Sequence, residues 1–209
     1  MERSRDIKEM LKDANILFLI TLIAGLVLGF VYELTKEPIR LQEEKAIQEA
    51  CQAVFADATN LGLVFQEENY VPDATKQAEF AQMGVEIGTV YAAVTKGGEL
   101  YGYVVESTTK EGYGGSIVLY VGITTEGAVN GVSILEIVET PGLGMNADAV
   151  LVPQFKGVQT TEFTYTKTGS TADNEIDAIS GATITTKAIV NAVNGALRVV
   201  TEDLLKGGN

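Results

Sequence analysis

The sequence contains no histidine and no tryptophan, and its single cysteine is Cys51. Without histidine there can be no Ser-His-Asp or Cys-His catalysis and no histidine-ligated zinc or haem, and one thiol cannot hold an iron–sulfur cluster. One cysteine also cannot form an intramolecular disulfide, so cysteine usage does not indicate the redox compartment. Cys51 lies in an apolar helical stretch and is expected to be a small buried hydrophobe. Any redox chemistry must therefore come from an acquired cofactor, and we expect neither a catalytic residue nor a metal site.

Basic residues are also scarce: 15 Lys and Arg stand against 28 Asp and Glu, which gives a net charge of −13. Binding to nucleic acid phosphates needs an excess of Lys and Arg, so a nucleic-acid partner is not expected. The first 13 residues are electrically balanced, with four bases and four acids. The acidic excess therefore lies entirely beyond the apolar run that follows.

Residues 15–32 contain no charged side chain, and their length approaches the ~20 residues that a bilayer span requires. We predict a transmembrane helix over residues 15–33, in which Gly25 and Gly29 form a G-x-x-x-G face suited to close helix packing. Four Lys and Arg precede this span, and Lys36, Arg40 and Lys45 follow it. The positive-inside rule then favours a cytoplasmic segment over residues 1–14 and an extracytoplasmic domain over residues 34–209.

The sequence pattern of the rest of the chain is typical of an α+β domain. Short β-rich runs separated by glycine turns predict successive hairpins of a curved antiparallel sheet, and helices are expected to cover one side of it. Apolar spacing predicts a helix that leads out of the membrane and a second helix that closes the chain. The expected strands cover residues 89–94, 100–105, 116–121 and 129–135, and the expected helices cover residues 41–58 and 186–205.

A cluster of small and hydroxyl residues stands where the last helix is expected to begin. It reads Ser180-Gly181-Ala182-Thr183-Ile184-Thr185-Thr186-Lys187 and follows Asp177. The start of a helix offers unpaired backbone N–H groups and the positive end of the helix dipole, which suit a phosphate. Ser, Gly and Thr at this place are also ordinary helix-capping residues. Asp177 could serve a modifying enzyme or simply form an Asx turn.

Two glycine-rich stretches precede this cluster. They are Gly112-Tyr113-Gly114-Gly115 and Glu139-Thr140-Pro141-Gly142-Leu143-Gly144. The second can form a tight loop with inward-pointing amides, which could hold the edge of a flat ring against Leu143 or a tyrosine. The alternative is a pair of surface turns. Candidates for stacking on such a ring are Tyr101, Tyr103, Tyr113 and Tyr120, although strand aromatics more often serve core packing.

The ordered motifs Gly-Tyr-Gly-Gly, E-T-P-G-L-G and D-x-x-S-G-A-T resemble the G subunit of the Rnf electron-transport complex, a relative of the C subunit of the sodium-pumping NADH:quinone oxidoreductase. The last motif resembles the site at which flavin transferases esterify the phosphate of FMN onto a threonine. The resemblance implies that Thr183 carries a covalent FMN, with Thr185 as the second choice. It further implies that Ser180, Gly181, Ala182 and Thr185 shape the phosphate pocket, and that the flavin is lined by Glu139, Thr140, Gly142, Leu143 and Gly144.

The same resemblance implies an electron relay in the cytoplasmic membrane, within an ion-translocating ferredoxin:NAD oxidoreductase. Its partners would be the other membrane subunits and a flavin transferase. The chain itself has no G-x-G-x-x-G at the start of a βαβ unit, so it is not expected to be the dehydrogenase. The alternatives are the C subunit of the quinone reductase, a free-standing membrane-anchored FMN carrier, and a ligand-binding or scaffold domain without flavin.

Overall fold

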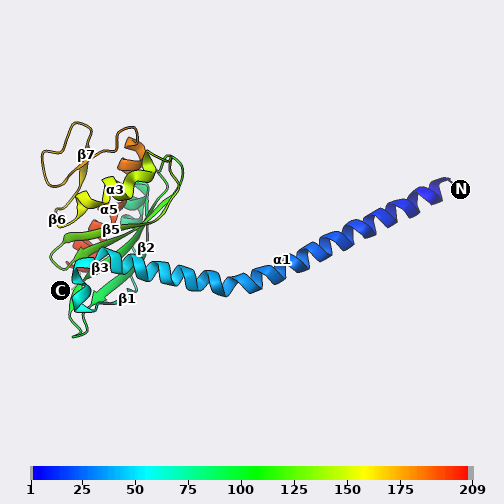
Figure 1. Cartoon of the computed structure of the whole chain (residues 1–209), viewed down its shortest axis with the longest axis horizontal. Coiled ribbons are helices and arrows are strands. Elements are labelled where there is room, and N and C mark those ends of the chain that lie inside the picture. The colour runs from blue at the N-terminus through cyan, green and yellow to red at the C-terminus, as the bar shows by residue number, and fades with distance from the viewer. Residues whose placement is uncertain (1, 207–209) are drawn as a thin grey trace. The chain divides into compact units, whose positions relative to one another are not determined.

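The computed structural model describes residues 2–206, with side chains from Met10 onward. Residue 1 of the predicted segment 1–14 and residues 207–209 of the predicted domain 34–209 lie outside the described residues. The chain divides into two compact units, residues 1–45 and residues 46–209. The boundary falls inside one long helix, α1 (Glu2–Val54), which is drawn in blue to cyan in Figure 1.

The first unit consists of the N-terminal part of α1. Its apolar side chains are exposed from Ile16 to Tyr32, and among the described residues α1 is the one helix that is long and apolar enough to cross a membrane. Length and composition thus support a candidate span here, while its limits at residues 15–33 stay a prediction. The helix continues through Pro38 without interruption, so the helix expected over residues 41–58 is the end of α1, and a 3-10 helix, η1 (Ala56–Leu61), follows it.

The second unit is α+β and is built on a six-stranded antiparallel sheet in the order β1-β2-β3-β4-β5-β6. The central strands confirm the two predicted hairpins, and register shifts interrupt the β2–β3 and β4–β5 pairs. A separate pair, β7 (Thr164–Thr166) and β8 (Glu175–Asp177), is parallel. The six strands are β1 (Val64–Glu68), β2 (Val85–Val94), β3 (Leu100–Thr109), β4 (Ile117–Thr124), β5 (Ala128–Ile137) and β6 (Val158–Gln159).

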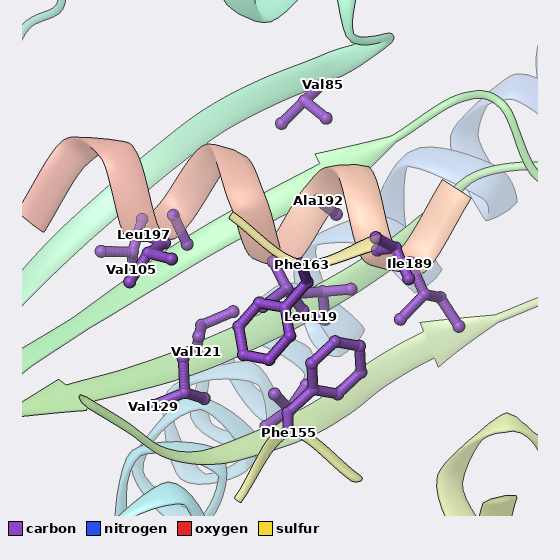
Figure 2. Close-up of a cluster of buried hydrophobic side chains, with 14 of the residues drawn as sticks. Val85, Val105, Leu119, Val121, Val129, Phe155, Phe163, Ile189, Ala192 and Leu197 are labelled. Atoms are coloured by element: carbon purple, nitrogen blue, oxygen red, sulfur yellow. The ribbon is translucent and has the colours of Figure 1, made fainter. Parts of the chain in front are cut away.

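The larger core lies between the sheet and α5 (Thr183–Arg198), whose apolar face is buried along its length. Figure 2 shows Ile189, Ala192 and Leu197 of α5 near Val105, Leu119 and Val121 of the strands, with Phe155 and Phe163 beside them. The two phenylalanine rings meet edge to face with centroids 5.0 Å apart. Further helices on the route to α5 are α2 (Ala74–Gln82), η2 (Gly144–Asn146), α3 (Ala147–Val150) and α4 (Val152–Phe155).

A second core covers the opposite face of the sheet, which corrects the prediction that helices cover only one side. Cys51 and Val54 of α1, together with Phe55, pack against Val104 and Tyr120. Because side chains alternate between the faces of a strand, Val104 and Tyr120 face this core whereas Val105 and Leu119 face α5. The end of α1 is therefore part of the folded domain as well as its connection to the apolar segment.

The closing helix begins earlier than its apolar spacing predicts. It starts at Thr183 instead of Thr186 and ends in a π-helical segment, η3 (Val199–Leu204). Two of its polar residues bind neighbouring segments. The side-chain amide of Asn194 accepts from the amide of Phe163 and donates to its carbonyl, and Asn191 donates to the carbonyl of Met83. These contacts fix the middle and later turns of α5 against the segments around Phe163 and Met83.

Candidate functional site

A cavity of about 470 Å³ lies at the N-terminus of α5 and brings the predicted motifs together. Its volume falls within the ~300–1,000 Å³ typical of ligand pockets. One wall is formed by the start of α5, and the other comes from the loop after β5 and from the turn between β3 and β4. The lining residues are Tyr113, Glu139, Thr140, Leu143, Gly144, Gly181, Ala182, Thr183, Ile184 and Thr185.

Glu139 lines this cavity and is only 8% exposed. Its Oε1 accepts a hydrogen bond from the backbone N–H of Tyr113 at 2.7 Å. The neighbouring Gly112 allows this contact, because a β-carbon there would lie 2.9 Å from Glu139 Oε1 and 2.2 Å from the carbonyl oxygen of Gly115. Glu139 thus connects the β3–β4 turn to the E-T-P-G-L-G loop.

At Gly144 that loop packs directly against α5. A β-carbon at Gly144 would lie 2.7 Å from Thr185 Oγ1 and 2.9 Å from Glu139 Oε2. Real side chains do not tolerate contacts this short, so only glycine fits here. The loop itself is closed by the carbonyl of Thr140, which accepts from the amides of Leu143 and Met145 at 3.1 and 3.3 Å.

The three threonines of the S-G-A-T-I-T-T sequence have different surroundings. Thr183 is the first residue of α5, is partly exposed and faces the cavity. Thr185 is 1% exposed, with its hydroxyl against Gly144. Thr186 is fully buried, and its hydroxyl donates to the carbonyl of Ala182 at 3.0 Å and accepts from the amide of Ile179 at 3.2 Å. Of the three, Thr183 is therefore the most accessible to a ligand or an enzyme.

The start of α5 lacks a conventional cap. Ala182 stands at the N-cap position without a side-chain cap hydrogen bond, and the first intrahelical bond runs from Thr186 N to Ala182 O at 3.0 Å. The amides of Thr183, Ile184 and Thr185 precede that bond and have no carbonyl in their own helix. They form the positive end of a 16-residue helix beside the cavity.

Two of the predicted site residues, Ser180 and Gly142, do not line the cavity. Ser180 is exposed on the segment before the helix. Gly142 and Gly181 both have φ +78°, and a β-carbon at Gly181 would lie 3.2 Å from Leu143 Cδ2, so these glycines shape the two walls. Ile184 lines the cavity and was not predicted, because its apolar side chain gave no sign that it faces the site instead of the core.

Of the four tyrosines proposed for stacking, only Tyr113 reaches the cavity. Tyr101 packs edge to face on Phe55 at a centroid distance of 5.5 Å, and Tyr120 is buried beneath the end of α1. Tyr103 packs against the α5-side core. Side-chain alternation and the register of β3 and β4 decide these positions, and neither can be read from residue type.

Asp177 lies outside the cavity and organises the chain before α5. Its Oδ1 accepts from the amide of Ser170 at 2.5 Å, and its own amide donates to Gln154 Oε1 at 2.7 Å. Asp177 therefore joins α4 and the 167–171 loop to the segment that ends in Ser180. This contact spans seven residues, so Asp177 has a structural role here but does not form the expected Asx turn with Ser170.

Cys51 is a buried hydrophobe, as predicted, on the side of the sheet opposite α5. Burial raises the pKa of its thiol to about 12, and the negative charge of Glu106 acts in the same direction. Burial also raises the pKa of Tyr120, again with the charge of Glu106 contributing. These groups do not line the cavity.

Two family models match this chain. The FMN-binding domain matches residues 112–198, a range that contains every residue lining the cavity, and the RnfG N-terminal region matches residues 1–54. A partial likeness to the crystal structure of Shewanella oneidensis NqrC has a TM-score of 0.45 at 25% identity. It covers 52% of this chain and 54% of that one, too little overlap to support a conclusion.

Full-length relatives agree with both family models. The chain is 31% identical over 200 residues to the G subunit of the Na(+)-translocating ferredoxin:NAD(+) oxidoreductase complex of Acetobacterium woodii, with 93% of each chain covered. It is 34% identical to the G subunit of the proton-translocating ferredoxin:NAD(+) oxidoreductase complex of Clostridium ljungdahlii, over 91% of this chain and 95% of that one. For the G subunit of the ion-translocating oxidoreductase complex of Vibrio vulnificus, identity is 33% over 80% and 78% of the two chains. The chain thus belongs to the RnfG family, the G subunits of Rnf-type ion-translocating oxidoreductase complexes, and contains that family's FMN-binding domain.

Proposed function

We propose that this protein relays electrons through a single FMN, esterified to Thr183, within a membrane complex that couples ferredoxin oxidation and NAD reduction to ion translocation. FMN supplies the redox chemistry, since it accepts and donates electrons and the side chains here do not. The observation that carries the attachment site is the position of Thr183: the first residue of α5, partly exposed and facing the cavity.

The cavity residues suit the chemical parts of FMN. The unpaired amides at the start of α5 provide donors for a phosphate next to Thr183. Leu143, Ile184 and Tyr113 offer apolar and aromatic surface for a flat ring. Gly144 has no side chain, so its backbone packs closely against Thr185 and Glu139 in the cavity wall.

The charge of the cavity gives a physical reason for a covalent bond. In the part of the chain that the structure describes, no Lys or Arg lines the cavity, whereas Glu139 does. A phosphate dianion held by helix amides alone would bind weakly beside a carboxylate. An ester removes one phosphate charge and prevents dissociation, which matters most if the domain faces the outside of the cell.

The assignment of Thr183 over Thr185 rests on access. A flavin transferase must bring FAD and Mg²⁺ to the acceptor hydroxyl, and Thr185 is 1% exposed with Gly144 against its Oγ1. Attachment at Thr185 would require the E-T-P-G-L-G loop to open. We therefore expect the transferase to modify Thr183.

Membrane topology is part of the same proposal. Residues 15–33 would cross the cytoplasmic membrane, with residues 1–14 in the cytoplasm and residues 34–209 outside. The exposed apolar length of α1 and the small excess of Lys and Arg before it support this arrangement. A protease added to intact spheroplasts should then digest the FMN domain, and protection of that domain would reverse the orientation.

The experiment that tests the cofactor uses the full-length chain co-expressed with a flavin transferase. Wild type, Thr183→Ala, Thr183→Ser and Thr185→Ala are denatured, separated by gel and inspected for flavin fluorescence. We expect fluorescence in wild type and Thr185→Ala, loss in Thr183→Ala, and partial retention in Thr183→Ser, which keeps a hydroxyl. A dark wild-type band beside a transferase active on another substrate would refute the covalent flavin.

Membership in a working complex needs its own measurement. Purification of the tagged chain from its native membrane should recover multi-span membrane subunits in a fixed ratio. Recovery of a fluorescent chain alone would favour a free-standing FMN carrier instead.

A further inference from the structure

We propose that Glu139 is a positioning residue that holds Tyr113 at the mouth of the cavity, where the tyrosine ring serves as a platform for the flavin ring. This inference rests on the proposed function, since it presupposes FMN in the cavity. The hydrogen bond that links the two residues, however, forms without flavin and can be tested in the flavin-free protein.

The 112–115 loop is built so that one side chain stands out from a tightly packed backbone. A β-carbon at Gly114 would lie 2.1 Å from the carbonyl oxygen of Val138, and one at Gly112 would lie 2.2 Å from that of Gly115. The loop backbone is therefore pressed against residues 138–139. Tyr113 is the only residue of the loop with a side chain, and it is 71% exposed while lining the cavity.

Tyr113 therefore presents a large aromatic side chain to solvent directly beside the cavity. Because the ring lines the cavity, a flat ligand bound there can stack on it. Tyr103, Tyr101 and Tyr120, the other candidates, pack elsewhere in the fold. The only aromatic ring available to the cavity among the described residues is therefore that of Tyr113.

The loop is secured by a buried charged acceptor. Glu139 Oε1 receives the Tyr113 amide at 2.7 Å, and Glu139 Oε2 lies at the point where Gly144 meets Thr185. The same carboxylate therefore contacts the β3–β4 turn and the loop that packs on α5. Hydrogen bonds to charged acceptors are stronger than those to neutral ones. Removal of the Glu139 side chain should release the loop, whereas glutamine should still accept from the Tyr113 amide.

The first measurement is hydrogen exchange, by mass spectrometry, on the full-length protein without flavin. We expect exchange of the segment containing Tyr113 to accelerate about tenfold to hundredfold in Glu139→Ala, the range expected when a charged hydrogen bond is lost. Glu139→Gln should stay close to wild type. The matched control is Glu106→Ala, since Glu106 also accepts a backbone amide, that of Thr89 at 3.1 Å, but away from the cavity. It should accelerate exchange near Thr89 and leave residues 112–115 unchanged.

The second measurement is flavin emission from the folded, flavin-loaded protein. A tyrosine in contact with an excited flavin quenches its fluorescence, so wild type and Glu139→Gln should be dim. Tyr113→Leu and Glu139→Ala should both be several-fold brighter at equal flavin content. Should Glu139→Ala fail to fold, Glu139→Asp takes its place, because the shorter side chain cannot reach the amide of Tyr113.

Each outcome decides one part of the inference. Unchanged exchange at Tyr113 in both Glu139→Ala and Glu139→Asp would overturn the link between the residues. Faster exchange without brighter emission would preserve the link and overturn the role of Tyr113 as a platform. A wild-type chain that carries no flavin would refute the proposed function, and the platform with it, while the exchange experiment would still decide the link.

Discussion

Gly144 lies so close to Thr185 that a β-carbon on residue 144 would stand 2.7 Å from the threonine hydroxyl oxygen. The two residues are remote in sequence, and their approach joins the E-T-P-G-L-G loop to the first turn of α5. The same β-carbon would lie 2.9 Å from Glu139 Oε2. Loop, carboxylate and helix terminus therefore form one packed unit whose shape depends on a single glycine.

Gly144→Ala should separate the loop from α5. We expect a loss of about 1–3 kcal/mol in the free energy of unfolding, the usual penalty of overpacking, and a lower yield of flavin incorporation. Urea unfolding and gel fluorescence measure the two effects. Gly97→Ala is the matched control, since its β-carbon would meet only Thr95 Oγ1 at an ordinary 3.6 Å. Equal behaviour of the two variants would contradict the packing argument.

Glu139→Gln should raise the midpoint potential of the bound flavin. A negative charge next to the ring disfavours the anionic reduced form and so lowers the potential, and glutamine removes that charge while keeping an acceptor. The expected rise is on the order of 30 mV, equivalent to about 1.4 kcal/mol for two electrons. Redox titration monitored by flavin absorbance measures it. The control is Glu86→Gln. Glu86 is exposed and pairs with Lys110 (Oε2 to Nζ, 3.0 Å), so its replacement should leave the potential near the wild-type value.

Asn194→Ala should destabilise the domain more than Asn191→Ala. Asn194 is 3% exposed, and its amide both accepts from Phe163 N at 2.8 Å and donates to Phe163 O at 2.9 Å. Alanine leaves both backbone groups buried without that partner, at a cost of about 2–4 kcal/mol. Asn191 donates one hydrogen bond, to Met83 O, and this bond is less buried. Asn191→Ala should therefore lower the free energy of unfolding by about 1 kcal/mol. Thermal unfolding of the two variants would reveal the order, and a reversed order would contradict the larger stabilising role of the Asn194–Phe163 hydrogen bonds.

The Cys51 thiol should resist alkylation in the folded protein at pH 8, because it is buried and its pKa is raised to about 12. A thiol pKa that is higher in the folded than in the unfolded state stabilises the fold below the unfolded value, near 9. That contribution is lost as pH rises from 9 toward 12. Urea midpoints between pH 8 and 10 should therefore fall less steeply in Cys51→Ala than in wild type. Rapid labelling at pH 8 without denaturant would contradict the burial.

The sequence predicted those features that depend on local pattern. The charge-free run around Gly25 predicted a helix with the length of a membrane span, and the glycine turns at residues 97–98 and 126–127 predicted the hairpins β2–β3 and β4–β5. Alternation and turn chemistry act over a few residues, so they can be read without coordinates. The start of α5 was misplaced by three residues, because Thr183, Ile184 and Thr185 were read as loop chemistry although they form its first turn.

Those local patterns could not predict features that depend on contacts between residues far apart in the sequence. Nothing in the spacing of Tyr101, Tyr113 and Tyr120 indicates that only Tyr113 reaches the cavity, because strand register and the docking of α1 decide it. The S-G-A-T-I-T-T sequence likewise offers chemically equal hydroxyls. Residue types and order alone determined the family, the apolar segment and the pair of motifs that meet at the cavity. The tertiary structure decided which hydroxyl remains accessible, since burial of Thr185 and Thr186 arises only when the Gly144 loop and the sheet pack against α5.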